Sequence, residues 1–394
     1  MIGSFDFATA GRIIFGPNRV KELPKLAREF GTRVFLVTGG DQGRHRNVIQ
    51  ALETAGLELG HCAITGEPSV ADVESGAGSA RNHRATVVIG IGGGSVIDAA
   101  KAIAALATNE GPALDYLEVV GRALPLPQRA LPIIAAPTTA GTGSEATRNA
   151  VLCVPEKRVK VSLRHISMLP SVALVDPELT LSLPPDVTAQ TGLDALTQLI
   201  EPYLSCKATP MTDTLCWAGI LKVQLALKPS FDDGSDLAAR AEMSMASLWG
   251  GIALANSGLG VIHALAGPLG GMFPAPHGAI CAALLSHGLE TNLIAARLPS
   301  AAKSPSAGKF VQRMESLASA MTGGQAKSPD SAIEAIRKLI QSLNIPPLSS
   351  WGVTESDIPE IAKKALETSS MKGNPFPLTA ADVEGLLRRS LHST

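Results

Sequence analysis

Short apolar runs alternate with helical patterns along the first half of the chain. Residues 33–38 (RVFLVT) combine β-branched and aromatic side chains and stop at a glycine pair, which predicts a buried strand. Residues 47–56 follow with a helical pattern that ends at a glycine. The same succession continues with predicted strands at 61–65, 85–95 and 131–139 and predicted helices at 70–84 and 96–108. Strands that alternate with helices pair in parallel, so this half is predicted to form an α/β sheet covered on both faces.

The pattern changes around residues 182–190 (SLPPDVTAQ), beyond which the apolar positions follow long helical periods. Three long segments carry these periods: 211–228, 236–258 and 330–343. Residues 297–309 are rich in serine, proline and glycine and predict an exposed loop. The change at the Pro184–Pro185 pair predicts a domain boundary, with an α/β domain over residues 1–183 and an all-helical domain over residues 184–394.

Composition narrows the class of protein. The 394 residues include 45% hydrophobic and 18% charged side chains, so a large buried core is expected. The formal net charge of −1, without a long basic run, argues against a nucleic-acid partner. The first sixteen residues lack the pattern of a signal peptide and no apolar run reaches the roughly 18 residues that span a bilayer, so a cytoplasmic protein without a membrane partner is expected. No CxxC pair occurs, which predicts reduced and mostly buried thiols at Cys62, Cys153, Cys206, Cys216 and Cys281.

A glycine-rich stretch joins the third predicted strand to a helix at residues 90–102 (GIGGGSVIDAAKA). Glycines let a backbone approach a phosphate closely, and a helix N-terminus offers free N–H groups and the positive end of a dipole. Ser95 would cap this helix or donate to a phosphate oxygen. Three successive glycines exceed what a tight turn needs, so the stretch predicts a phosphate-binding loop, although Ser95 stands where the usual dinucleotide fingerprint has its third glycine.

A second polar loop follows the next predicted strand at residues 136–147 (APTTAGTGSEAT). Four threonines and one serine supply hydroxyl groups, and the glycines keep the backbone pliable. Ligands of open parallel sheets bind beyond the carboxyl ends of the strands. Two such loops at two strand ends are what a dinucleotide site needs.

These motifs resemble the iron-containing (group III) alcohol dehydrogenase family. The resemblance covers nearly the whole chain, from IIFGPN at residues 13–18 through the two loops to TGLDALTQLIEPYLS and HALAGPLGGMFPAPHGA. It implies a dehydroquinate synthase-like architecture, in which an α/β dinucleotide-binding domain with a parallel sheet packs on an all-α domain across a cleft. It also implies hydride transfer between NAD or NADP and a small alcohol or aldehyde, usually with Fe²⁺ and sometimes with another ion such as Zn²⁺. Such enzymes are often homodimers.

The family's site residues carry over position by position. The resemblance places Gly93, Gly94 and Ser95 on the pyrophosphate. Other residues that it places around the cofactor are Gly39, Asp98, Thr138, Thr139, Thr142 and Lys160. The metal ligands that it implies are Asp194, Gln198, His263 and His277. The implied catalytic residues are His263, His277 and Lys160.

Two departures from the family pattern concern the metal. Gln198 replaces a histidine ligand, and Gly267 stands where most members have a further histidine that lines the pocket. An amide oxygen is a weaker ligand than imidazole, so the divalent site would be retained with lower affinity. The alternative is that the ion is lost, that Gln198 bonds substrate directly, and that a histidine relays the proton. The surviving Asp194 favours retention, because an unpaired buried carboxylate is costly to keep ionised.

The choice of cofactor also departs from the common pattern. NAD-preferring members that resemble this chain carry an aspartate where Gly39 stands, and Arg44 and Arg46 follow closely. Both arginines could pair with a 2′-phosphate, so NADP is expected to be tolerated; the alternative is that both are ordinary solvated helix residues.

Three functions remain open at this point. The first is an NAD(P)-dependent alcohol dehydrogenase or aldehyde reductase. The second is a related reaction on an oxo acid, either a metal-independent reductase that resembles maleylacetate reductase or a hydroxyacid–oxoacid transhydrogenase, with Lys160 or Arg148 to receive the anion. The third is a nucleotide-binding protein that no longer turns over.

Overall fold

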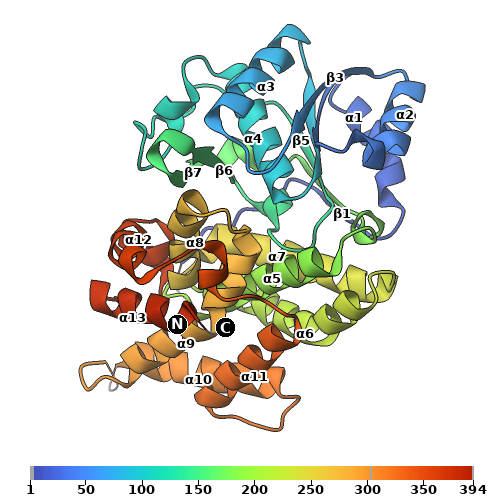
Figure 1. The fold of residues 1–394 in the computed structure, drawn as a ribbon. Coiled ribbons are helices and arrows are strands. Elements are labelled where there is room, and N and C mark those ends of the chain that lie inside the picture. The colour runs from blue at the N-terminus through green and yellow to red at the C-terminus, as the bar shows by residue number, and fades with distance from the viewer. Residues whose placement is uncertain (1–3, 302–303, 393–394) are drawn as a thin grey trace. The chain divides into compact units, whose positions relative to one another are not determined.

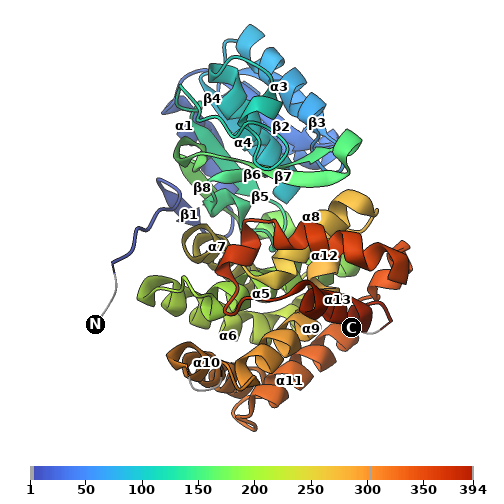
Figure 2. The same cartoon turned by 90° about the vertical axis from the view of Figure 1, so that its left-hand side faces the viewer.

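The computed structural model describes residues 4–301 and 304–392, and these fall into two compact units. Residues 8–182 form an α/β unit, and residues 183–392 form a helical unit that also includes residues 4–7. The α/β unit therefore ends close to the Pro184–Pro185 pair, while the short N-terminal segment groups with the helices and not with the sheet. Figures 1 and 2 show the elements of each unit.

The α/β unit is built on a six-stranded sheet in the order β1-β8-β5-β4-β2-β3, in which every neighbouring pair is parallel. A separate antiparallel hairpin pairs β6 with β7. The strands are β1 Ile13–Phe15, β2 Arg33–Gly39, β3 Glu58–Ile64, β4 Val87–Gly92, β5 Ile133–Pro137, β6 Asn149–Val154, β7 Val159–Arg164 and β8 Val172–Val175. The helices of this unit are α1 Leu23–Arg28, α2 Arg46–Thr54, α3 Val70–Asn82 and α4 Gly94–Thr108. The fold class expected from the alternating pattern is confirmed.

Both faces of the sheet are buried, which explains why its strands are continuous apolar runs. On β2, Phe35 and Val37 pack in the same cluster as α3 and α4, whereas Val34 and Leu36 pack with α1 and α2 on the opposite face. Side chains alternate along a strand, so a strand covered on both sides must be apolar at successive positions.

Four strands escaped prediction. β1 and β8 have three and four residues, too few to show a period, and β6 and β7 form the hairpin outside the main sheet. Because β1 precedes it, the strand before the glycine loop is the fourth along the chain, not the third as expected.

The helical unit contains nine α-helices among the described residues. They are α5 Pro185–Leu204, α6 Pro210–Asp232, α7 Leu237–Ser257, α8 Val261–Met272, α9 His277–Arg297, α10 Pro305–Met321, α11 Pro329–Ser342, α12 Ile358–Leu366 and α13 Ala380–Ser390. The exposed loop predicted at 297–309 is wrong at both ends, since α9 includes Arg297 and α10 begins at Pro305 with Ser304 as its N-cap; residues 302–303 lie outside the described residues. α10 and α11 lie side by side (Figure 2).

α9 is the central helix of this unit. By length and composition it could cross a bilayer, as could the bent pair α7 and α8 if taken as one span. However, 89% of the apolar window of α9 is buried inside the protein, as in the core helix of a globular unit.

A buried ionic network ties α4 to the segment that follows β5. The Lys101 side chain has no exposed surface, and its Nζ contacts Asp98 Oδ1 at 2.9 Å, the Ser144 carbonyl oxygen at 3.0 Å and Thr147 Oγ1 at 2.8 Å. All three donors of the ammonium group are therefore satisfied. Glu145 is buried beside this network, and burial raises the pKa of its carboxyl from 4.5 to about 7.

The raised pKa of Glu145 predicts a pH-dependent stability. This carboxyl ionises above pH 4.5 in the unfolded chain but only near pH 7 in the folded chain. Its contribution to the free energy of unfolding is therefore complete below pH 4.5 and is lost as the pH rises through 7. Glu145→Gln should remove this loss and raise the free energy of unfolding at pH 8 by up to roughly 3 kcal/mol. Thermal unfolding measured from pH 4 to 8 checks it, with exposed Glu156→Gln as the control. If the stability of wild type and of Glu145→Gln changed with pH in the same way, the expectation would be contradicted.

Candidate metal centre and nucleotide loops

The two polar loops lie next to each other at the carboxyl edge of the sheet. β4 and β5 are adjacent and parallel, with Gly92 opposite Pro137, so both chains leave the sheet at the same edge. The chain runs from β2 to β3 in one direction across the sheet, then returns to the other side of β2 for β4 and continues to β5. The edge between β2 and β4 is therefore a topological switch point, the place where ligands of such sheets bind.

The glycine loop presents the N-terminus of α4 to this edge. Gly93 is the N-cap in an extended conformation, and α4 begins at Gly94. Ser95 thus lies inside the first turn, and its predicted role as N-cap is wrong because the helix begins one residue before it. The first N–H groups of α4 have no partner within the helix, so they remain suited to an anion.

The threonine loop packs directly on the glycine loop. The Thr138 amide donates to the Gly92 carbonyl oxygen at 2.9 Å. A Cβ at Gly93 would lie 3.4 Å from the Thr139 methyl, an ordinary contact, whereas a Cβ at Gly94 would lie 2.6 Å from the Thr142 methyl. Gly94 is therefore needed for packing within the protein itself, while Gly93 leaves space beside the helix end.

Two of the residues expected around the cofactor are engaged elsewhere. Besides Lys101, Asp98 accepts from the Ser144 hydroxyl and, through Oδ2, from the Val151 amide at 2.9 Å. Its carboxylate thus holds the threonine loop in place. Lys160 on β7 pairs with Glu67 Oε1 at 3.1 Å, and its side chain is 6% exposed.

Gly39 ends β2 at the same edge of the sheet, with no atom within 4 Å of a Cβ built on it. Asp41 turns away into a local cap and accepts from the Gly43 amide at 3.0 Å. Arg44 and Arg46 follow and are exposed, and Arg44 approaches Asp41 at 4.0 Å.

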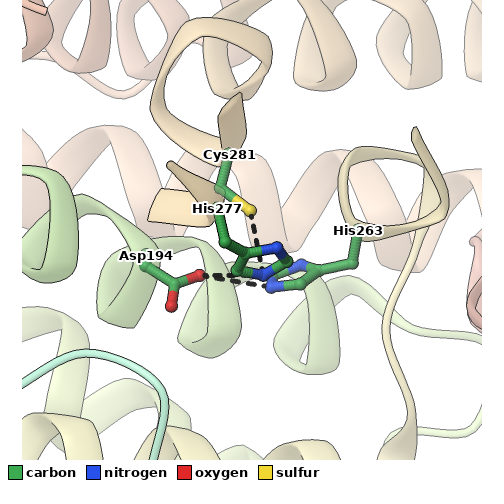
Figure 3. A group of neighbouring side chains, drawn as sticks. All are labelled: Asp194, His263, His277 and Cys281. Atoms are coloured by element: carbon green, nitrogen blue, oxygen red, sulfur yellow. Dashed lines mark hydrogen bonds and ion pairs between the residues drawn. The ribbon is translucent and has the colours of Figure 1, made fainter. Parts of the chain in front are cut away.

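The predicted metal residues converge inside the helical unit. Asp194 on α5, His263 on α8 and His277 at the first position of α9 point toward one another (Figure 3). Gln198 lies one turn after Asp194 on α5, and its Nε2 donates to Asp194 Oδ2 at 2.9 Å. Cys281 joins them from α9, one turn after His277.

The ligand atoms of this group face a common centre. Asp194 Oδ1 lies 3.4 Å from His263 Nε2 and 3.8 Å from His277 Nε2. Cys281 Sγ lies 3.7 Å from His277 Nε2, and the four ligand atoms are all within 4.8 Å of one another. Among the described residues, neither Asp194 Oδ1 nor His263 Nε2 has a hydrogen-bond partner, although both are buried. Buried polar atoms rarely stay unbonded, so a cation between them fits this donor set.

Glu201 orients the His263 ring. The Ile262 amide donates to Glu201 Oε1 at 2.7 Å, and His263 Nδ1 lies 2.6 Å from Glu201 Oε2. A carboxylate only accepts, so Nδ1 is the donor and Nε2 is directed at Asp194. The carboxylate also satisfies an amide in the first turn of α8, where negative charge is favourable. Gly260 makes this possible, because a Cβ there would lie 2.8 Å from Glu201 Oε1.

His277 is placed by close contact of two helices. A Cβ at Gly278 would lie 2.5 Å from the Gln190 carbonyl oxygen, so only glycine lets the start of α9 approach α5 this closely. The approach brings the His277 ring to Asp194.

The charges of the cluster reinforce one another. Burial acts to lower the pKa of both imidazoles, but the Cys281 sulfur and Asp194 outweigh it, so the pKa of His277 rises to about 9 and that of His263 lies well above its usual value. Burial acts to raise the pKa of the Cys281 thiol and of Asp194, yet both lie below their usual values because of the two imidazoles. The Asp194 carboxylate and the Cys281 sulfur therefore favour a positive charge at the centre of the cluster.

Two residues of this centre were not anticipated from the sequence. Cys281 follows His277 by four positions and Glu201 follows Asp194 by seven, so each shares a helix face with a predicted ligand. That spacing was the available signal, but only the folded helices show that these faces meet.

Comparison with known proteins identifies the class. The family model of iron-containing alcohol dehydrogenase matches residues 10–177, and that of the Fe-containing alcohol dehydrogenase family, C-terminal, matches residues 188–391. Alcohol dehydrogenase 4 of Saccharomyces cerevisiae is 36% identical over 350 residues, which cover 88% of this chain and 87% of the yeast protein. The 1,3-propanediol dehydrogenase of Klebsiella pneumoniae is 33% identical over 395 residues, 98% of each chain. The crystal structure of sulfoacetaldehyde reductase from Bifidobacterium kashiwanohense in complex with NAD⁺ has a TM-score of 0.85 at 28% identity, covering 99% of both chains.

These matches span both units of the chain. The chain belongs to the iron-containing alcohol dehydrogenase family. It is an oxidoreductase, an alcohol dehydrogenase or aldehyde reductase.

The packing of the two loops predicts different outcomes for neighbouring glycines. Gly93→Ala should leave stability unchanged but weaken NADPH binding at least tenfold, because its methyl group would occupy the approach to the first amides of α4. Gly94→Ala should instead lower the free energy of unfolding by about 1–3 kcal/mol, because of the contact with Thr142. Fluorescence titration with NADPH and thermal unfolding separate the two effects. Gly78→Ala on α3, where a Cβ meets nothing within 4 Å, is the control. Undiminished NADPH binding by folded Gly93→Ala would exclude this loop as the phosphate site.

Proposed function

We propose that this enzyme interconverts small aldehydes and alcohols with NADP(H) or NAD(H), assisted by a divalent ion that Asp194, His263 and His277 hold. The observation that supports a bound metal is that Asp194 Oδ1 lies 3.4 Å from His263 Nε2 and 3.8 Å from His277 Nε2. When bound, the ion supplies a Lewis acid that polarises an aldehyde carbonyl or lowers the pKa of an alcohol.

The residues of the chain have distinct tasks in this proposal. Asp194 supplies the negative charge that retains a dication, and Gln198 holds its other oxygen. Glu201 keeps the His263 ring turned so that Nε2 faces the centre. The His277 side chain is 35% exposed, so it forms the solvent-facing side of the centre.

The substrate is proposed to be a small uncharged aldehyde or alcohol. The Klebsiella relative is named for 1,3-propanediol, which supports this class. An oxo acid would need a free cation, and the ion pair of Lys160 with Glu67 weighs against that residue in this role.

The nucleotide is proposed to bind at the switch point of the sheet, over the loops that follow β2, β4 and β5. NAD⁺ in the reductase relative supports a nicotinamide cofactor. Arg44 and Arg46, which are exposed in the segment that follows Gly39, support acceptance of NADP.

Chelation tests the proposed function. Purified enzyme should oxidise NADPH with a panel of short aldehydes, and removal of metal should lower turnover at least tenfold. Added Zn²⁺ or Fe²⁺ should restore it. NADPH binding, measured by fluorescence, should persist throughout, because the nucleotide loops belong to the other unit. Asp194→Asn should not be restored by metal, since it loses the anionic ligand. Full turnover in metal-free wild type would show that the reaction proceeds without an ion.

The end of β2 predicts a change of cofactor preference. Gly39→Asp introduces a carboxylate where no atom stands in its way, and its charge would repel a 2′-phosphate. The ratio of kcat/KM for NADPH to that for NADH should fall roughly 5- to 150-fold, which corresponds to a free-energy difference of about 1–3 kcal/mol. Steady-state kinetics with both cofactors measures it, with Gly308→Asp on α10 as the control, since that exposed glycine also has no atom within 4 Å of its Cβ position. An unchanged ratio would show that the adenosine ribose does not lie at Gly39.

A further inference from the structure

Cys281 lies among ligand atoms and not among apolar side chains alone. It is completely buried on α9, one turn after His277, and its sulfur is 3.7 Å from His277 Nε2. Figure 3 shows it pointing to the same centre as Asp194 and the two imidazoles. Cys216 is equally buried in the same unit, on α6, but does not belong to this group. Burial of a small thiol therefore does not by itself explain where Cys281 points.

Three of the six distances between ligand atoms in the cluster are close to the edges of a tetrahedral site. Zinc bonds of about 2.0–2.1 Å to nitrogen and oxygen and about 2.3 Å to sulfur, at tetrahedral angles, separate nitrogen from oxygen by about 3.4 Å and nitrogen from sulfur by about 3.6 Å. The corresponding distances here are 3.4 and 3.8 Å from Asp194 Oδ1 to the two imidazoles and 3.7 Å from Cys281 Sγ to His277 Nε2. The other three distances among these four atoms are within 4.8 Å, so a bound metal would draw the four ligands closer together.

Gln198, the other candidate for the fourth ligand, already has a role. Its Nε2 donates to Asp194 Oδ2 at 2.9 Å, which leaves Oδ1 of the same carboxylate directed at the two imidazoles. This hydrogen bond stabilises the metal site through Nε2, whereas Gln198 would bind a metal only through Oε1, a neutral oxygen that suits zinc less well than a thiolate.

We propose that Cys281 is the fourth protein ligand of the divalent ion, with Asp194, His263 and His277, and that this thiolate makes the centre selective for Zn²⁺ over Fe²⁺. The inference rests on the proposed metal-assisted function and replaces the amide of Gln198 as a ligand. One thiolate, two imidazoles and a carboxylate form a set of nitrogen, sulfur and oxygen donors that suits zinc. Gln198 is then a positioning residue for Asp194.

Cobalt substitution tests the ligand directly. Co²⁺ adopts zinc sites, and a cobalt–thiolate bond gives an intense charge-transfer absorption in the near ultraviolet that nitrogen and oxygen ligands do not give. Wild-type protein stripped of metal and titrated with Co²⁺ should develop this band at one equivalent. Cys281→Ala should bind Co²⁺ without the band, whereas Cys216→Ala, the matched buried thiol, should retain it. Bound Co²⁺ without the band in wild type, or a band that survives in Cys281→Ala, would overturn the proposal.

Metal competition tests the selectivity. Wild type equilibrated with equal Zn²⁺ and Fe²⁺ under anaerobic conditions should retain mainly zinc by elemental analysis. Cys281→Ala should lose zinc affinity at least tenfold, since even loss of an outer partner of a ligand costs 10- to 100-fold. The double variant Cys281→Ala/Gln198→His should recover metal binding through a third imidazole, without the charge-transfer band and with a larger share of iron. Equal zinc affinity in wild type and Cys281→Ala would overturn the proposal.

Alkylation provides a measurement that needs no variant. Mass spectrometry after iodoacetamide treatment under partly unfolding conditions should show Cys281 protected by Zn²⁺ and Cys216 unaffected by it. Equal labelling of Cys281 with and without zinc would contradict the ligand. Failure of the wider function is distinguishable, because wild type that binds no metal and still reduces aldehydes would refute the metal-assisted reaction. Wild type that binds Co²⁺ without a thiolate band would refute only the role of Cys281.

Discussion

Two buried carboxylates on one face of α5 require compensation, and the centre of the helical unit is arranged around them. Asp194 and Glu201 are 1% and 6% exposed, so each needs hydrogen-bond donors or positive charge beside it. Glu201 finds the first amides of α8 and the His263 ring. Asp194 finds the Gln198 amide and faces two imidazoles. The contacts of α5 with α8 and α9 at Gly260 and Gly278 follow from the same requirement, because side chains there would keep the partners apart.

The α/β unit contains a buried cation, which likewise needs hydrogen-bond partners. Lys101 is fully buried and depends on Asp98, the Ser144 carbonyl and Thr147 for its three donors. Those partners belong to α4 and to the segment after β5, so the network holds the glycine loop and the threonine loop to one another. The network thereby connects the two loops at the switch point, while the first amides of α4 remain available to a ligand.

The loss of a family ligand at Gln198 on α5 has a structural counterpart at Cys281 on α9. A helix that offers a ligand at one position offers the next at four residues further along, on the same face. α5 no longer uses that position for imidazole, because Gln198 stands there, whereas α9 carries Cys281 one turn after His277. A ligand lost from one helix can thus be replaced from the helix opposite, since both faces border the same centre.

The periodicity of the chain was sufficient to predict much of the architecture. The parallel sheet covered on both faces, the helical second half and the two loops after β4 and β5 all follow from local apolar patterns and glycines, which depend on neighbours in sequence. The short strands β1 and β8 could not be found in this way, because three or four residues show no period and their pairing is decided by distant strands. The start of α10 at Pro305 was missed for a related reason, since a serine N-cap followed by proline is also typical of a loop.

Some residues of the metal centre could likewise be predicted from the sequence and others could not. Asp194, His263 and His277 were recognisable as residue types in a resembling pattern, and the structure brings them together. No local sequence pattern identifies Cys281 or Glu201 as part of the site, because a cysteine or a glutamate on a helix is most often an ordinary packing or surface residue. Their meaning depends on which helix faces meet, and that is decided by long-range packing between α5, α8 and α9. Sequence periodicity therefore predicted most of the elements and the resemblance supplied most of the candidate ligands, whereas only tertiary contacts placed a thiol and a second carboxylate at the same centre.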